Sequence, residues 1–259
     1  MCEIFGVLAR EKIYLNDYLK EFYRHCVEHP HGWGLARMDG TESVIEKEPV
    51  SANKSQYLKQ RLSMPIREKT AFAHIRYATI GNVDYKNCHP FSLKDDTGRR
   101  WTLNHNGTIF DYPPIAKYVA TQTGDTDSER ILMHIVDQIN RGIAEGSRKW
   151  TKEERFQFLD DLVCGLSKGN KLNFLLYDSE VMYVHTNYQS SLFHRESRDG
   201  TIFSTQPLGR DKESWKPVPF TTLLAFEDGR MTRVGTNHGN EYIVNEEDMK
   251  YIYQIFANL

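Results

Sequence analysis

The sequence predicts a protein of the α+β class, in which helices pack on antiparallel sheets. Strand-like segments come first, two amphipathic helices follow, and short β-rich segments separated by turns fill most of the remainder. The segments do not alternate as strand, helix and strand, so a doubly wound parallel sheet is not expected. The 259 residues contain 39% hydrophobic residues, without an internal repeat or a linker, and are expected to form one domain over 1–259.

The first part of the chain is predicted from its hydrophobic periodicity. Cys2–Ala9 is apolar with β-branched and aromatic residues, which is typical of a buried strand. In Leu15–Val27 the apolar positions recur every three or four residues, which predicts a helix. The polar, glycine-containing segment Lys94–Arg100 is expected to form a turn. Further strands are expected over Trp33–Met38, Ser43–Glu48, Ala71–Ala78 and Arg100–His105.

Two amphipathic helices are predicted next, over Asp127–Arg141, with Thr126 or Asp125 near its N-cap, and over Glu153–Leu166. Asp228-Gly229 is a strong hairpin signal. A last helix is expected over Glu246–Ala257. Short strands are expected over Leu172–Tyr177, Val181–His185, Ser191–His194, Thr201–Ser204, Thr221–Phe226 and Arg230–Val234.

The composition excludes several classes of function. Lys and Arg total 33 and Asp and Glu total 35, so the net charge of -2 offers no overall attraction to nucleic acid or to an anionic membrane. No apolar run is long enough to span a bilayer, and the N-terminus lacks the features of a secretory signal. The four cysteines are scattered without a CxxC pair, which argues against a disulfide framework and favours a cytoplasmic location.

Cys2 is a candidate nucleophile because it directly follows the initiator methionine. A lone cysteine in a strand is normally a small buried hydrophobe. A small second residue permits removal of Met1, however, which would leave the Cys2 thiol beside its own α-amino group. That amine has a reference pKa of about 8 and can accept the thiol proton, directly or through a water molecule.

Three further positions are candidates for binding a substrate. The Asn106 side chain and the Gly107 N–H could stabilise an oxyanion, although Asn-Gly is also a hairpin signal. Arg76 could bind an α-carboxylate, although an arginine at a strand end is usually a surface charge. Asp127 could accept hydrogen bonds from an α-ammonium group. Taken alone, its motif favours instead a carboxylate stabilised by the dipole at the start of a helix, and the two roles can coexist.

These residues lie in motifs that follow a recognisable order. After Cys2 and Gly6 come HGWG at 31–34, RYATIG at 76–81, NCHPF at 87–91, NHNGTI at 104–109 and TDSE at 126–129. Together the motifs resemble those of the class II glutamine amidotransferases, the N-terminal nucleophile family. The resemblance implies a four-layer αββα sandwich of two facing antiparallel sheets, the N-terminal nucleophile hydrolase fold.

The same resemblance implies an enzyme that hydrolyses the γ-amide of glutamine through a γ-glutamyl thioester on Cys2. Asn106 and Gly107 would form the oxyanion hole. Arg76 would bind the substrate α-carboxylate and Asp127 its α-ammonium group, while Thr79 would line the glutamine pocket.

Residues around these positions would have supporting roles. Tyr77–Asn82 would belong to a mobile loop that closes over the substrate. His74 and His89 would be structural supports beside the site.

Two departures from the family pattern leave the function open. Many members begin Cys-Gly, whereas this chain reads Cys2-Glu3, and large members carry a synthase domain beyond the glutaminase domain, whereas this sequence ends at Leu259. HGWG is more similar to the stand-alone branch, which includes γ-glutamyl amidohydrolases of thiol metabolism. The chain is therefore expected to be a glutaminase that supplies ammonia to a separate synthase subunit, an amidohydrolase of a larger γ-glutamyl compound, or an idle regulatory binding subunit. A homo-oligomer is compatible with each.

No cofactor is expected. Cys26, His29 and His31 are spaced closely enough for a zinc site, but Cys26 falls on the apolar face of a predicted helix, so no metal is expected either. The phosphate-binding patterns GxxxxGK[ST] and GxGxxG are absent. The expected partner is glutamine or another γ-glutamyl small molecule, rather than nucleic acid or a membrane.

Overall fold

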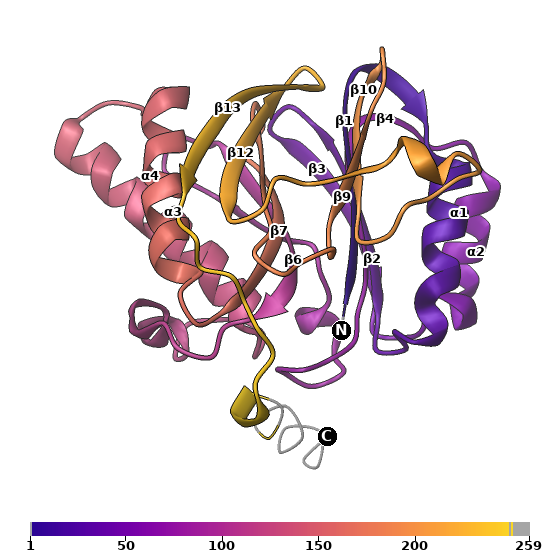
Figure 1. Cartoon of the computed structure of the whole chain (residues 1–259), viewed down its shortest axis with the longest axis horizontal. Coiled ribbons are helices and arrows are strands. Elements are labelled where there is room, and N and C mark those ends of the chain that lie inside the picture. The colour runs from indigo at the N-terminus through magenta and orange to yellow at the C-terminus, as the bar shows by residue number, and fades with distance from the viewer. Residues whose placement is uncertain (1, 249, 251–259) are drawn as a thin grey trace.

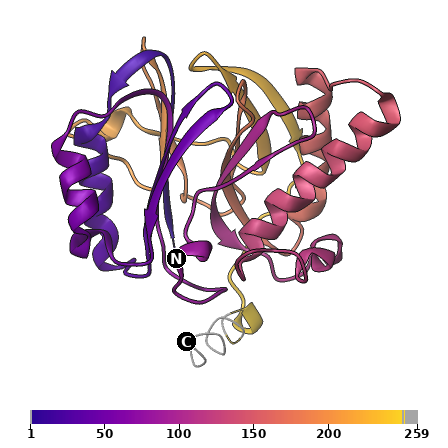
Figure 2. The same ribbon diagram turned by 180° about the vertical axis from the view of Figure 1, so that it is seen from behind.

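Two antiparallel sheets face each other, and each carries helices on its outer face (Figures 1 and 2). This arrangement comes from a computed structural model, which describes residues 2–248 and 250. The predicted α+β class and the four-layer αββα sandwich are confirmed. Among the described residues, no helix is both long and apolar enough to cross a membrane.

The first sheet has seven strands and includes the N-terminal strand β1. Helices α1 (Asn16–Arg24) and α2 (Gln56–Ser63) cover its outer face. The strands, in spatial order, are β11 (Lys216–Pro217), β9 (Phe193–Glu196), β10 (Gly200–Ser204), β1 (Glu3–Tyr14), β4 (Arg67–Ile75), β2 (Trp33–Asp39) and β3 (Glu42–Glu48).

The second sheet has six strands and is covered by helices α3 (Asp127–Gly146) and α4 (Lys152–Leu166). Thr126 caps α3 by accepting the Glu129 N–H, and Thr151 and Glu154 form a capping box at α4. The strands, in spatial order, are β13 (Arg230–Asn237), β12 (Thr222–Glu227), β8 (Met182–His185), β7 (Lys171–Tyr177), β6 (Arg100–Thr108) and β5 (Phe91–Lys94).

Three apolar clusters correspond to the three interfaces between four layers. One joins the first sheet to α1 and α2 and includes Phe22 and Trp33. Another joins the second sheet to α3 and α4 and includes Trp101 and Leu132. The third lies between the sheets and includes Leu175. Since burying one such side chain contributes about 1.5–3 kcal/mol, each interface holds its layers together.

Most predicted elements are present, with shifted ends. The predicted hairpin at Asp228-Gly229 joins β12 to β13, with φ of +47° and +71° at its two residues. The strand predicted over Ala71–Ala78 ends at Ile75, so its last three residues belong to the following loop. The helix predicted over Glu246–Ala257 extends into residues 249 and 251–259, which lie outside the described residues.

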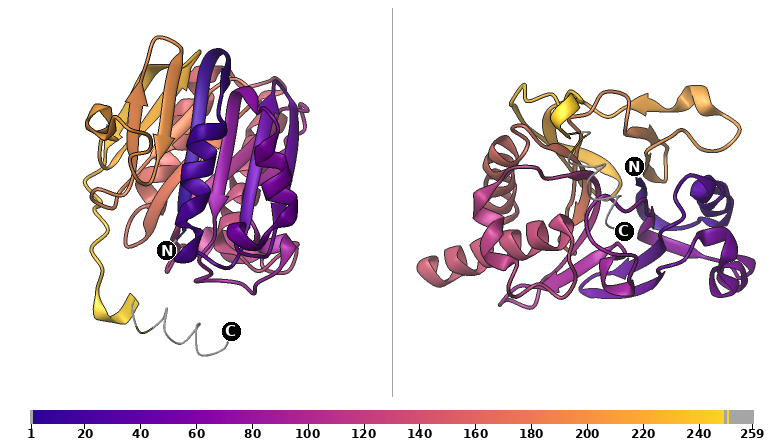
Figure 3. Two further views of the ribbon diagram at one scale, coloured as in Figure 1. Left: turned by 90° about the vertical axis from the view of Figure 1, so that its right-hand side faces the viewer. Right: turned by 90° about the horizontal axis from the view of Figure 1, so that it is seen from below.

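Among the α-helices and strands of the described residues, the sequence prediction missed α2, β5 and β11. Each is short, and α2 has a single buried residue, Leu58, so its periodicity is weak. The N-terminal end of the chain lies at one end of the molecule, between the two sheets (Figure 3). The candidate site is built there.

Candidate active site between the two sheets

Cys2 directly precedes β1 and lines a cavity together with Asn106 and Lys171 of the second sheet. Ile4 belongs to the inter-sheet cluster, whereas Phe5 packs toward the helices. Because successive strand residues point to opposite faces, Cys2 shares the face of Ile4. The thiol is partly buried and lies against the backbone of Tyr77. The Tyr77 N–H donates to Sγ, and the thiol donates to the Tyr77 carbonyl, each at 3.3 Å.

The ionisation of the Cys2 thiol is governed by opposing effects. Burial raises its pKa, because the thiolate loses hydration. The hydrogen bond from Tyr77 lowers it, as do the positive charges of the N-terminal amino group, Arg76 and Lys171. The reactivity of the thiol therefore depends on these neighbouring groups.

Asn106 and Gly107 belong to β6, on the opposite sheet from Cys2. They pair with Asn173 and Leu172 of β7, so the interpretation of Asn106-Gly107 as a hairpin turn is wrong. Asn106 is 2% exposed, and its Oδ1 has no hydrogen-bond partner among the described residues. The Asn-Gly pair thus sits within a buried strand, with the asparagine side chain on the inter-sheet face.

Glycine is required at position 107 because two groups approach its Cα closely. A Cβ there would lie 2.1 Å from the Lys171 carbonyl oxygen and 2.4 Å from His105 Nε2. His105 is fixed in turn, because its Nδ1 lies 2.9 Å from Ser128 Oγ. Any larger residue would push β6 away from β7 at the predicted oxyanion site.

Polar bonds pin the two sheets together near the site. Asn104 of β6 donates from Nδ2 to the carbonyl of Ala73 at 2.8 Å and to that of Phe5 at 3.3 Å. His74 of β4 approaches the His105 carbonyl through Nε2 at 3.2 Å. These bonds fix β6, which carries Asn106, against β1, which follows Cys2.

Arg76 is buried, contrary to the usual surface position of a strand-end arginine. It is 2% exposed, and its guanidinium donates to three carbonyls of its own loop. Nη1 reaches Asn82 at 2.8 Å, and Nη2 reaches Ile80 at 3.0 Å and Gly81 at 2.8 Å. In this structure the predicted carboxylate ligand is therefore the anchor of the predicted mobile loop.

Asp127 and Thr79 lie near the same end of the second sheet. Asp127 Oδ2 accepts the Ile109 N–H at 2.8 Å, and Oδ1 accepts the Ser128 N–H at 2.9 Å. Thr79 Oγ1 lies 3.4 Å from Thr108 Oγ1. Asp127 thus orders the backbone after β6, as its position at the start of α3 suggests.

His74 and His89 stack on each other, with ring centroids 4.2 Å apart. Both are buried, and burial lowers the pKa of His74 to about 3 and that of His89 well below its usual value. Both rings are therefore neutral at neutral pH. The two rings therefore pack against each other as neutral, buried side chains.

Cys2 and Asn106 line one cavity of about 360 Å³. It contains residues from the N-terminus, from β6 and β7, and from the loops that follow β8 and β10. The lining residues are Cys2, Glu3, Glu28, His29, Asn106, Lys171, Tyr188, Ser190, Ser191, Phe193, Thr205 and Gln206.

Lys171 is a residue of this cavity that the sequence analysis missed. It is 2% exposed, and its Nζ lies 4.3 Å from the centre of the Tyr188 ring. Burial lowers its pKa to about 7, an effect that the charge of Cys2 partly opposes. A lysine followed by an apolar strand looks like a solvent-exposed strand end in the sequence, which is why no signal marked it.

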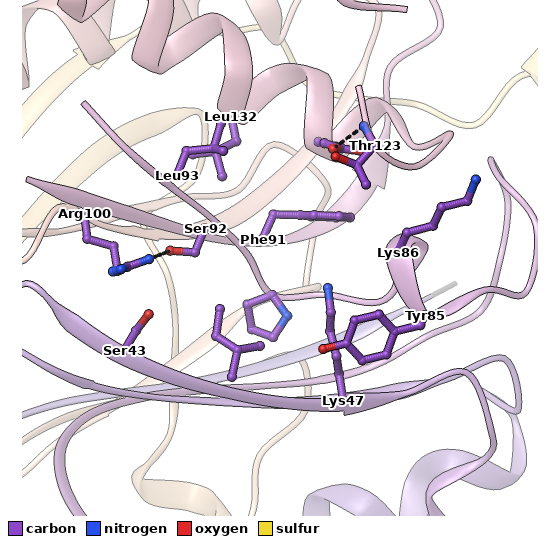
Figure 4. Close-up of a pocket in the computed structure, with 13 residues that line it drawn as sticks. Ser43, Lys47, Tyr85, Lys86, Phe91, Ser92, Leu93, Arg100, Thr123 and Leu132 are labelled. Carbon is purple, nitrogen blue, oxygen red and sulfur yellow. Dashed lines mark hydrogen bonds between the residues drawn. The ribbon is translucent and has the colours of Figure 1, made fainter. Parts of the chain in front are cut away.

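A second cavity of about 440 Å³ lies between β3 and β5 (Figure 4). It is lined by three basic residues, Lys47, Lys86 and Arg100. Lys47 Nζ donates to the Cys88 carbonyl at 2.7 Å, and Arg100 Nη1 donates to Ser92 Oγ at 3.3 Å. Cys2 does not line this cavity, so the candidate active site is the smaller one.

Comparison with known proteins agrees with this geometry. The family model of the class II glutamine amidotransferases matches residues 1–197. The chain belongs to this family. An uncharacterized protein of Methanocaldococcus jannaschii is 27% identical over 259 residues, covering 89% of this chain and 70% of the relative.

Solved structures of the amidotransferases share the fold. A predicted glutamine amidotransferase from Pseudomonas aeruginosa superposes with a TM-score of 0.66 and 20% identity, covering 90% of this chain and all of that one (100%). Glutamine phosphoribosylpyrophosphate amidotransferase from Bacillus subtilis gives a TM-score of 0.65 and 18% identity, covering 89% of this chain and 48% of that one. At these identities the likeness concerns the fold alone.

Proposed function

We propose that this class II amidotransferase hydrolyses the side-chain amide of glutamine through a γ-glutamyl thioester on Cys2. The supporting observation is that Cys2 of one sheet and Asn106 of the other line a single cavity. A nucleophile and an oxyanion donor must face the same carbonyl group, and this cavity offers both.

In the proposed reaction, removal of Met1 exposes the α-amine of Cys2, which takes the thiol proton. The thiolate attacks the amide carbon, and the Asn106 side chain and the Gly107 N–H stabilise the oxyanion. The carbon–nitrogen bond breaks, and the amine proton leaves with ammonia. Water then attacks the thioester, which releases glutamate and restores the thiol.

The proposed substrate contacts require a rearrangement at Arg76. Its guanidinium is engaged by the carbonyls of Ile80, Gly81 and Asn82. We expect the α-carboxylate to replace some of these carbonyls as the loop moves, since a charged acceptor binds an arginine more strongly than a neutral one. Asp127 would accept from the α-ammonium group while keeping its backbone bonds, and Thr79 would line the pocket.

A second candidate substrate is a larger γ-glutamyl compound. The cavity of about 360 Å³ beside Cys2 is lined in part by Tyr188 and Phe193, aromatic side chains against which a larger leaving group could pack. A γ-glutamyl amide with a larger leaving group would undergo the same chemistry at Cys2.

The test is release of ammonia and glutamate from L-glutamine. We expect activity in the wild type, none in Cys2→Ala, and unchanged activity in Cys164→Ala, since Cys164 is the other partly exposed cysteine. Intact mass should show that Met1 is absent. Equal activity in wild type and Cys2→Ala would refute the proposal.

A panel of γ-glutamyl amides separates the two substrates. Hydrolysis of a larger amide with little hydrolysis of glutamine would favour the second candidate. If glutamine is the substrate, adding a synthase and its acceptor would show whether ammonia is transferred or released.

A further inference from the structure

Lys171 lies on the same face of the second sheet as the predicted oxyanion residue. Along β7, Leu175 belongs to the inter-sheet cluster, whereas Leu172 and Phe174 pack toward the helices. Residues that differ by two share a face, so Lys171 and Asn173 point between the sheets. Cys2, the residue before β1, lines the same cavity as Lys171.

Burial makes Lys171 an unusual lysine. Lysine is almost never fully buried, because its ammonium group loses hydration, yet this side chain is 2% exposed. Tyr188 contributes its ring face to the ammonium group. The negative charge of the Cys2 thiolate raises the Lys171 pKa, and the positive charge of Lys171 lowers the Cys2 pKa. The ionisation of each group therefore depends on the other.

The other charged or titratable side chains that line the cavity either have hydrogen-bond partners of their own or are exposed to solvent. Glu3 bonds to His25 Nδ1 and to Gln206 Nε2, both at 2.8 Å. His29 Nδ1 lies 2.9 Å from the His25 carbonyl. Glu28 is exposed at the rim.

The strands packed against the pair add two more groups. Arg76, which directly follows β4, also lowers the Cys2 pKa, but its guanidinium is held by loop carbonyls. His105 of β6 is buried, which lowers its pKa, and the charge of Lys171 lowers it further.

We infer that Lys171 is a further active-site residue, whose ammonium group stabilises the thiolate of Cys2 across the cavity. This inference rests on the proposed role of Cys2 as the nucleophile. When the thiol proton passes to the α-amine, the negative sulfur remains opposite a buried positive charge. The attraction is strong there because little water screens it.

The experiment measures the thiol directly and needs no turnover. The rate of Cys2 alkylation by iodoacetamide is followed by mass spectrometry from pH 5 to pH 10 in wild type, Lys171→Met, Lys171→Gln and Lys171→Arg. Lys168→Met, at an exposed lysine nearby, is the matched control. Thermal unfolding verifies that each variant is folded.

Loss of the charge should raise the Cys2 pKa by about one unit, which lowers alkylation at pH 7 roughly tenfold in Lys171→Met and Lys171→Gln. Lys171→Arg and Lys168→Met should remain within about twofold of wild type. Unchanged alkylation in the folded Met or Gln variant would overturn the inference, as would an equal loss in Lys171→Arg. Because no glutamine is involved, a negative glutaminase assay would not affect this result.

Discussion

Replacing Gly107 by alanine tests whether the β6–β7 contact sets the geometry of the site. The new Cβ would lie 2.1 Å from the Lys171 carbonyl oxygen, and contacts below 3.0 Å essentially never occur. The backbones of β6 and β7 must therefore shift relative to each other until this distance has grown by at least 0.9 Å. Such overpacking costs about 1–3 kcal/mol of stability. Misplacing an oxyanion donor by roughly 1 Å reduces kcat by about 10²–10³-fold.

The assay compares kcat and the midpoint of thermal unfolding for Gly107→Ala and Gly146→Ala. Gly146 ends α3, and a Cβ there meets no atom within 4 Å, so this control should keep full activity. Labelling of Cys2 by an electrophilic glutamine analogue serves as a second readout of the same geometry. Wild-type kcat in Gly107→Ala would refute the reasoning, because the strands would then have separated without displacing the site.

Three further outcomes are expected. Arg76→Lys keeps the charge but loses the planar guanidinium that binds the loop carbonyls. KM should therefore rise by roughly tenfold or more and protease should cleave the loop 77–82 faster, whereas the control Arg100→Lys should change neither. Burial lowers the pKa of His185 to about 3, so between about pH 6.5 and pH 3 the unfolded chain binds a proton that the folded chain does not, and the free energy of unfolding falls with pH. His185→Asn should remove about 1.4 kcal/mol per pH unit of this decrease, as measured by urea titrations across that range. Arg155→Met should cost roughly 3–5 kcal/mol, because it leaves the buried carboxylate of Asp178 without its 2.7 Å partner, and a midpoint of unfolding within 2 °C of wild type would contradict this.

The sequence correctly predicted the family and the layers, and it singled out Cys2 and Asn106, which line one cavity. Their motifs are local, and their order along the chain is informative even though each motif alone is weak. Local sequence also favoured a hairpin turn at Asn106-Gly107, which is wrong, because pairing with β7 overrides the turn preference of that dipeptide. Tertiary pairing is set by residues far away in sequence.

Other features of the site could not be read from local patterns. Lys171 precedes an apolar strand, and its burial depends on packing between two sheets that the sequence does not locate in space. The partners of Arg76 are main-chain carbonyl groups, which every residue has, so no residue type in the sequence marks them. Asn104 likewise bonds to carbonyls of two other strands.

The hydrogen bonds of Asn104 have a consequence for how the proposed activity could be tuned. The proposed nucleophile lies at the start of one sheet and the proposed oxyanion donor in the other, so under the proposed mechanism turnover depends on the distance between the sheets. The gap between the sheets is filled by the apolar layer around Leu175, whose Cδ1 lies 2.4 Å from where a Gly6 Cβ would be. Larger or smaller apolar side chains in this layer should therefore change the distance between the sheets, and with it the turnover, without replacing any residue that contacts substrate.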